Sequence, residues 1–209
     1  MPQFCQSPCE SSTTMCKSIL VSGCLGCFCL TAMATPRVLL PEESRIEFVV
    51  KEMGVSVSGK FEHFDAAIDI DPSKPERSVA DLRIDVGSLS TGNDEADAVA
   101  VGPDWLDKDH AQYAHFKSAT IRTLGAGHYE AKGTLSIRNR EREIVISFSS
   151  ADQSNGRTVI TSDFPIPRSD FGIGGGIWNE GGVVAETIPV KVRLTLAPAG
   201  DKNTVASGR

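Results

Sequence analysis

Cysteine is missing from most of this sequence. All six cysteines lie at or before Cys29, and none follows in a chain of 209 residues. A thiol nucleophile and a disulfide are therefore excluded for everything after Cys29. A domain formed by that part must be stabilised by its hydrophobic core alone, which a chain of this length can bury.

An excess of positive charge is also missing. The chain has 21 Lys and Arg residues against 27 Asp and Glu residues, for a formal net charge of −6. Such a chain lacks the basic surface that grips a phosphate backbone, so we expect no nucleic-acid partner. With 40% apolar and 23% charged residues, the composition excludes a wholly disordered or collagen-like chain.

No apolar run is long enough for a transmembrane helix. The sequence predicts a signal peptide over residues 1–34, with a start at Met15 as one possibility. Lys17 gives the positive end, residues 19–30 the apolar stretch, and residues 32–34 a small-x-small cleavage site. Cleavage would leave residues 35–209 as one exported domain. The alternatives are an uncleaved anchor and lipoprotein processing that acylates Cys24.

The later sequence alternates between apolar and polar residues with the period of β-strands. Asn155-Gly156 predicts a hairpin with a type I′ turn. A shift of the apolar phase after Phe61 predicts a bulge or a sharp bend. Residues 93–112 break the pattern and predict a short helix that starts at Asn93-Asp94. About eight strands without a linker indicate an all-β antiparallel barrel or sandwich. The expected strands cover residues 44–51, 55–70 with the phase shift inside, 80–86, 116–122, 129–137, 144–152, 157–164 and 188–196.

Motifs for catalysis or metal binding are weak. Residues 54–60 resemble a phosphate-binding loop, but Phe61 stands where a Ser or Thr must bind magnesium, and the pattern there is that of a strand. Residues 172–176 lack the spacing of a dinucleotide fingerprint and indicate a loop. The acidic run with His110 favours a solvated helix face over a metal site. The acidic run contains Asp104, Asp107, Asp109 and His110. Because none of these motifs is convincing, we expect no enzyme, no metal and no cofactor.

Several short motifs, taken in order, resemble the YceI-like proteins, the bacterial polyisoprenoid-binding family. The resemblance covers about residues 37–197, and it depends on the order and spacing of the pieces. The motifs are Ser44-x-Ile46-x-Phe48, Gly54-Val55-Ser56, Gly59-x-Phe61-x-x-Phe64, residues 88–92, Asp104-Trp105-Leu106-Asp107, Tyr113-Ala114-x-Phe116-x-Ser118, residues 133–137 and residues 168–173, with residues 178–184 resembling an extension found in one branch.

The resemblance implies an extended lipocalin-like antiparallel β-barrel with a short helical excursion near 93–112. It also implies a periplasmic protein whose tunnel holds a long amphiphile: a polyisoprenoid, an isoprenoid quinone or a fatty acid derivative. Members of the family are binders rather than enzymes. Met53 replaces a histidine that many relatives carry before the glycine of the second motif, which puts any polar role at that place in doubt.

Inward faces of the expected strands supply an apolar lining for such a tunnel. Arg168, Ser169 and Trp178 are candidates for contact with a lipid headgroup at its mouth. Two alternatives stay open: an enzyme that acts on such a lipid through a histidine, and an interaction module with a solid core. A second copy of this chain, in a homodimer, is a further possible partner of the lipid-binding domain. Inward residues look the same in a tunnel and in a solid core. The predicted lipid contacts are Phe48, Phe61, Phe64, Ile68, Leu82, Ile84, Phe116, Ile137, Phe148, Trp178, Ile188 and Val190.

Overall fold

The structure is a computed structural model that describes residues 37–179 and 182–199. The signal peptide predicted for residues 1–34 and the possible acylation of Cys24 lie outside the described residues and stay predictions. Among the helices of the described part, none is long and apolar enough to cross a membrane.

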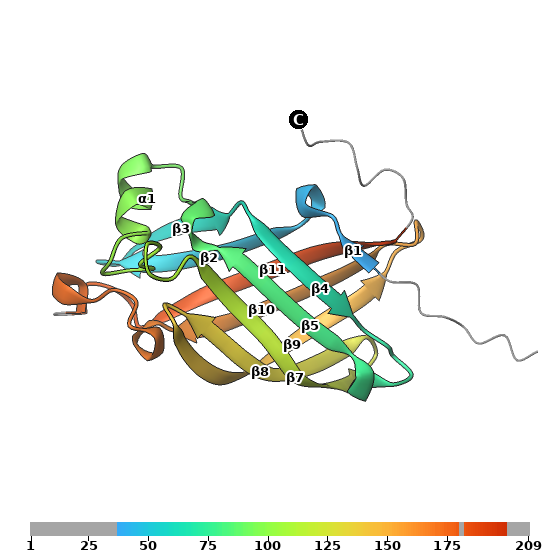
Figure 1. Ribbon diagram of the computed structural model, residues 1–209. Coiled ribbons are helices and arrows are strands. Elements are labelled where there is room, and N and C mark those ends of the chain that lie inside the picture. Colours follow the sequence, from blue (N-terminus) through green and yellow to red (C-terminus); the bar gives the residue numbers. More distant parts are fainter. Residues whose placement is uncertain (1–36, 180–181, 200–209) are drawn as a thin grey trace, which may run out of the picture. The chain divides into compact units, whose positions relative to one another are not determined.

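One antiparallel sheet makes up most of the described chain, which confirms the all-β prediction (Figure 1). The sheet has eleven strands. Two of them, of three and two residues, are too short to produce an alternating pattern and were not predicted. The strands are β1 (Arg37–Leu39), β2 (Arg45–Glu52), β3 (Val55–Phe61), β4 (Phe64–Asp69), β5 (Val79–Asp85), β6 (Leu89–Ser90), β7 (Tyr113–Gly125), β8 (His128–Ile137), β9 (Arg140–Asp152), β10 (Thr158–Pro167) and β11 (Thr187–Pro198).

The strand order makes the sheet curl round on itself. The order is β4-β5-β7-β8-β9-β10-β11-β2-β3-β6, with β1 on β11. Strands β3 and β4 lie near opposite ends of this order, yet only Glu62 and His63 separate them in the chain. So short a link requires the two ends of the sheet to meet. The phase shift predicted after Phe61 is this sharp bend, since β3 and β4 do not pair with each other.

Alternation along the strands places one face of the sheet inside. On β8 the buried residues are Tyr129, Ala131, Gly133, Leu135 and Ile137, while their neighbours point outward. The buried apolar residues of all long strands join in one cluster. This is the pattern of a sheet with one face on a core and one face in water.

Hairpin turns are where the prediction was partly wrong. The hairpin around Asn155-Gly156 exists, but only Gly156 has a left-handed φ, of 80°. The N–H of Gln153 donates to the carbonyl of Arg157 at 2.7 Å, which encloses residues 154–156 in a longer loop than a type I′ turn allows. The β8–β9 turn has the type I′ signature instead, because Arg138 and Asn139 have φ values of 53° and 57°.

The short helix is α1 (Asp94–Ala100), which starts where the sequence predicted. The Asn93 side chain accepts a hydrogen bond from the N–H of Ala96 at 3.0 Å and so caps the helix. Residues 101–112 form turns rather than more helix. The remaining helical turns are 3₁₀: η1 (Pro41–Glu43), η2 (Pro75–Arg77), η3 (Val86–Ser88), η4 (Arg168–Phe171) and η5 (Gly176–Asn179).

Candidate functional site

A cavity of about 190 Å³ lies inside the curled sheet. It is bounded by the inward faces of β2 to β5 and β7 to β11, by part of β6, and by residues from the 100–106 and 172–176 segments. Every residue that lines it is apolar except His115 and Ser162. The part of the fold that the structure describes is therefore hollow, which the sequence could not decide.

All but two of the predicted contact residues line this cavity. The exceptions are Phe64, which is buried beside it, and Trp178, which packs edge-on against Trp105 with ring centroids 5.6 Å apart. Whether any of these residues touches a lipid stays a prediction. The predicted residues that line the cavity are Phe48, Phe61, Ile68, Leu82, Ile84, Phe116, Ile137, Phe148, Ile188 and Val190.

Sequence reasoning missed a group of lining residues at one end. Trp105 and Leu106 belong to a turn segment without a periodic pattern, and Ile173 lies in the glycine-rich segment. Nothing in a strand pattern could have found them. Phe164 and Ile166 of β10 were findable, because both follow the inward alternation of that strand. Phe164 is the last residue of the expected strand, and Ile166 lies two residues beyond it.

The cavity is long and narrow. Its lining follows β11 from Ile188 to Leu194, which is roughly 20 Å of extended strand. The next inward residue, Leu196, is 2% exposed and no longer lines it. Thr158, opposite Leu196 on β10, is likewise buried. The small volume spread over this length suits a single hydrocarbon chain better than a bulky ligand.

A glycine on β3 shapes the wall of the cavity. Gly59 lies opposite Phe48 in the β2–β3 ladder. A Cβ atom at Gly59 would come within 2.3 Å of the Phe48 ring, so only glycine lets that ring lie across the strand. The ring centroids of Phe48 and Phe61 are 5.4 Å apart, an ordinary aromatic contact.

The two polar residues of the lining have partners within the protein. The hydroxyl of Ser162 donates to the carbonyl of Ser147 at 2.7 Å. Nε2 of His115 lies 2.7 Å from Oδ1 of Asp81, and both side chains are about two-fifths exposed, at 40% and 42%. The cavity thus offers apolar contact rather than free hydrogen-bonding groups.

The three predicted headgroup contacts do not line the cavity. Arg168 is 5% exposed, and its guanidinium donates to the carbonyls of Ile173 at 2.9 Å and Gly174 at 3.0 Å. Its nearest carboxylate is Glu186, with Nε 3.8 Å from Oε2.

Glu186 also accepts hydrogen bonds from the hydroxyl and the N–H of Ser169. The Ser169 hydroxyl is the main cause that lowers the pKa of Glu186 below its ordinary value, and the Arg168 charge adds to it. Arg168 and Ser169 therefore hold the glycine-rich segment against the start of β11. A headgroup role for them stays a prediction.

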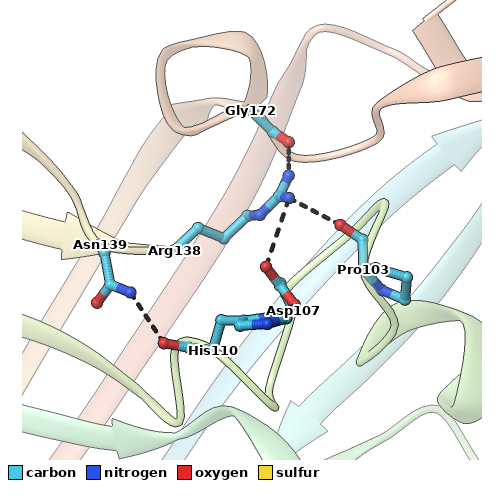
Figure 2. Close-up of polar contacts among 6 residues, drawn as sticks. All are labelled: Pro103, Asp107, His110, Arg138, Asn139 and Gly172. Atoms are coloured by element: carbon cyan, nitrogen blue, oxygen red, sulfur yellow. Dashed lines mark hydrogen bonds and ion pairs between the residues drawn. The ribbon is translucent and has the colours of Figure 1, made fainter.

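Arg138, in the β8–β9 turn, connects the segment around Pro103 with the segment around Gly172 (Figure 2). Its guanidinium donates to the carbonyl of Gly172 and, at 2.7 Å, to that of Pro103. It also lies 4.0 Å from a carboxylate oxygen of Asp107. The segments that it joins are those that carry Trp105, Leu106 and Ile173 into the cavity lining.

Neighbouring contacts strengthen this tie. The Asn139 side-chain amide donates to the carbonyl of His110 at 2.9 Å. Nδ1 of His110 is 2.8 Å from Oδ1 of Asp107, and this hydrogen bond raises the pKa of His110 above its ordinary value. No cluster of three or more potential metal ligands occurs among the described residues.

Comparison with known proteins agrees with this architecture. The model of the YceI-like domain matches residues 38–196. The chain belongs to the YceI-like family. A UPF0312 protein of Vibrio cholerae is 30% identical over 134 residues, which is 61% of this chain and 71% of that protein. A UPF0312 protein of Pseudomonas savastanoi is 27% identical over 172 residues, 77% of this chain and 90% of that protein.

Solved structures share the fold. BcnA of Burkholderia cenocepacia superposes with a TM-score of 0.72 at 29% identity, over 75% of this chain and 98% of that chain. A polyisoprenoid binding domain from Saccharophagus degradans superposes with a TM-score of 0.64 at 18% identity, over 78% of this chain and 99% of that chain. The second likeness is one of fold alone.

Proposed function

We propose that this YceI-like protein binds a long amphiphilic lipid and carries it in the periplasm after export. The observation that carries the proposal is the narrow apolar cavity inside the sheet. The ligand class is a polyisoprenoid, an isoprenoid quinone or a fatty acid derivative. One protein of the same fold is a polyisoprenoid binding domain, which supports this choice.

Burial of hydrocarbon supplies the affinity. Each methylene that moves from water into an apolar lining contributes about 0.8 kcal/mol. About ten such groups outweigh the cost of ordering the chain and still leave tight binding. Because His115 and Ser162 already have partners in the protein, the cavity selects a ligand by the length and apolar character of its hydrocarbon chain rather than by hydrogen bonds.

Mass spectrometry of organic extracts from the purified full chain tests the proposal. We expect a long-chain lipid in the extract, and we expect the delipidated protein to take up a polyprenol or an isoprenoid quinone. Leu82→Phe places a larger ring in the cavity and should reduce uptake, since Leu82 lines it. The matched control is Leu124→Phe, because Leu124 lies outside that cavity and is 50% exposed. A clean extract together with no uptake would overturn the proposal.

A further inference from the structure

The wall of the barrel divides between β9 and β10. These strands pair only where Phe148–Asp152 faces Thr158–Ser162. Beyond Ser162, β10 continues on β11 as far as Pro167, while β9 continues on β8 as far as Arg140. The region between β9 residues 140–147 and β10 residues 163–167 has no ladder, and we name it the slot.

Proline chemistry keeps the slot from closing. Pro165 lies opposite Pro189 of β11, and two prolines cannot exchange N–H bonds, so they occupy a non-hydrogen-bonded pair. The edge that Pro165 presents to β9 therefore lacks its donor. Pro167 follows two residues later on the same edge and lacks its donor as well. At the head of the slot, the Ser147 carbonyl is bound by the Ser162 hydroxyl at 2.7 Å.

The slot borders the cavity. Phe164 and Ile166 on one side and Ile146 and Phe148 on the other all line it. The inward-facing residues on the β10 side of the slot, Phe164 and Ile166, are half-buried, and Ile146 on the β9 side is buried. The turn η4 contacts β9, and its Phe171 is 1% exposed.

The free edge of β4 differs from the slot. Strand β4 pairs only with β5, so its other edge is also without a ladder. There β1 lies against it, and its inward residues Phe64 and Ile68 are each 9% exposed. At the β4 edge both of these residues are buried, whereas at the slot Ile146 of β9 is buried and Phe164 and Ile166 of β10 are half-buried.

The ends of the cavity are harder to pass than its side. At one end Leu196 and Thr158 fill the interior. At the other end, the segments that carry Trp105 and Ile173 are tied by Arg138. Passage along the axis would break those bonds, whereas no ladder hydrogen bond joins β9 to β10 between Val145 and Pro165, so passage there needs movement of side chains.

We propose that the slot is a lateral doorway, through which the hydrocarbon chain of the ligand enters and leaves sideways. This inference rests on the proposed function, since it concerns access to the same cavity. The chemical class that passes is a flexible hydrocarbon chain, and the polar end of the ligand stays outside the wall.

A reversible covalent cross-link across the slot tests the proposal. The six native cysteines are replaced by serine in the full chain, and Val145→Cys and Pro165→Cys are introduced. Both positions face outward and would lie opposite each other if the β9–β10 register continued. A bismaleimide with a disulfide in its spacer bridges them. With cis-parinaric acid as the fluorescent probe, we expect its transfer to phosphatidylcholine vesicles to slow by about tenfold or more. Reduction of the spacer should restore the rate.

The matched control places the same bridge where the strands already pair. Ser149→Cys with Thr161→Cys suits this purpose, because their hydroxyl oxygens are 2.7 Å apart across the ladder. That bridge should leave the transfer rate unchanged. An unchanged rate with the slot barred would overturn the doorway alone. Failure of the unbridged protein to take up cis-parinaric acid, a polyprenol or an isoprenoid quinone would overturn the proposed function, and the doorway with it.

Discussion

The two ends of the cavity are closed in different ways. At the solid end, Leu39 of β1 faces Leu196 of β11, and both are buried. At the tied end, turn segments line the cavity and are held by Arg138 and Arg168 through backbone carbonyls. The first end is therefore closed by apolar packing. The second end is closed by segments that a few polar contacts hold in place, and we call these segments the cover.

The difference matters because the two kinds of closure respond to different changes. A packed end loses stability when side chains change volume, since the neighbours relax only in part. A cover held by guanidinium–carbonyl bonds responds instead to loss of charge or of a single side chain. Paired substitutions at the two ends and in the hollow middle should therefore affect stability to different degrees.

The largest expected effect is the loss of packing at the solid end. Leu196→Ala should lower the free energy of unfolding by about 4 kcal/mol, because Leu196 is 2% exposed among packed neighbours. Leu82→Ala should cost only about 2 kcal/mol, since one side of Leu82 already faces the cavity. Urea unfolding of both variants measures the difference. Equal losses would contradict a hollow middle.

Enlarging the same two leucines should give the next largest difference. Leu196→Phe has no free volume to occupy and should destabilise the fold by about 1–3 kcal/mol. Leu82→Phe extends into the cavity and should change stability by less than about 1 kcal/mol. The urea midpoint of each variant reports the outcome. If both variants lose stability alike, the middle is filled rather than hollow.

Removal of the tie should loosen one end and spare the other. Arg138→Ala loses the bonds to Gly172 and Pro103, which should cost about 1–2 kcal/mol. Hydrogen exchange should rise in residues 101–112 and 172–176 and stay unchanged around Leu196. Arg122→Ala is the control, because Arg122 pairs with Glu130 on the outer face of the sheet, where water screens the ion pair, so its loss should change stability less than the loss of Arg138. Uniform exchange over the whole sheet would argue against a local cover.

The smallest effect is a pH dependence at the tied end. The hydrogen bond to Asp107 raises the pKa of His110 in the folded protein above its ordinary value of 6.5. The stabilisation is complete below that ordinary value and is lost as pH rises through the raised pKa. The free energy of unfolding of the unsubstituted protein should therefore fall slightly above pH 6.5. This fall should be absent in His110→Gln. An NMR titration of His110 that gives a pKa at or below 6.5 would disagree with this.

Much of the fold could be predicted from the alternating pattern. Tyr129, Ala131, Leu135 and Ile137 share one face because side chains alternate along a strand, whatever surrounds them. Asn93 marks the helix start because its short side chain caps the first turn. The turn at Asn155-Gly156 shows the limit: the sequence indicated a hairpin, but loop length and Asn155 conformation were set by how β9 meets β10.

The candidate site was predicted less completely. Phe48 and Ile188 follow from alternation, but Trp105 and Ile173 come from irregular segments that only the folded chain brings to the cavity. Arg168, expected at a mouth, is buried under the glycine-rich segment instead. Contacts between segments far apart in the sequence leave no local pattern, so no reading of one stretch could place them.

Alternation and short motifs are enough to place the strands, the inward and outward faces, and the family. Pro165 and Pro167 also explain why one edge of β10 cannot donate hydrogen bonds. In contrast, the hollow interior beside Leu82 and the solid interior beside Leu196 follow from how the folded sheet packs. The physical reason is that an inward leucine has the same neighbours in sequence in both cases, while the distance across the barrel depends on how far the whole sheet curls.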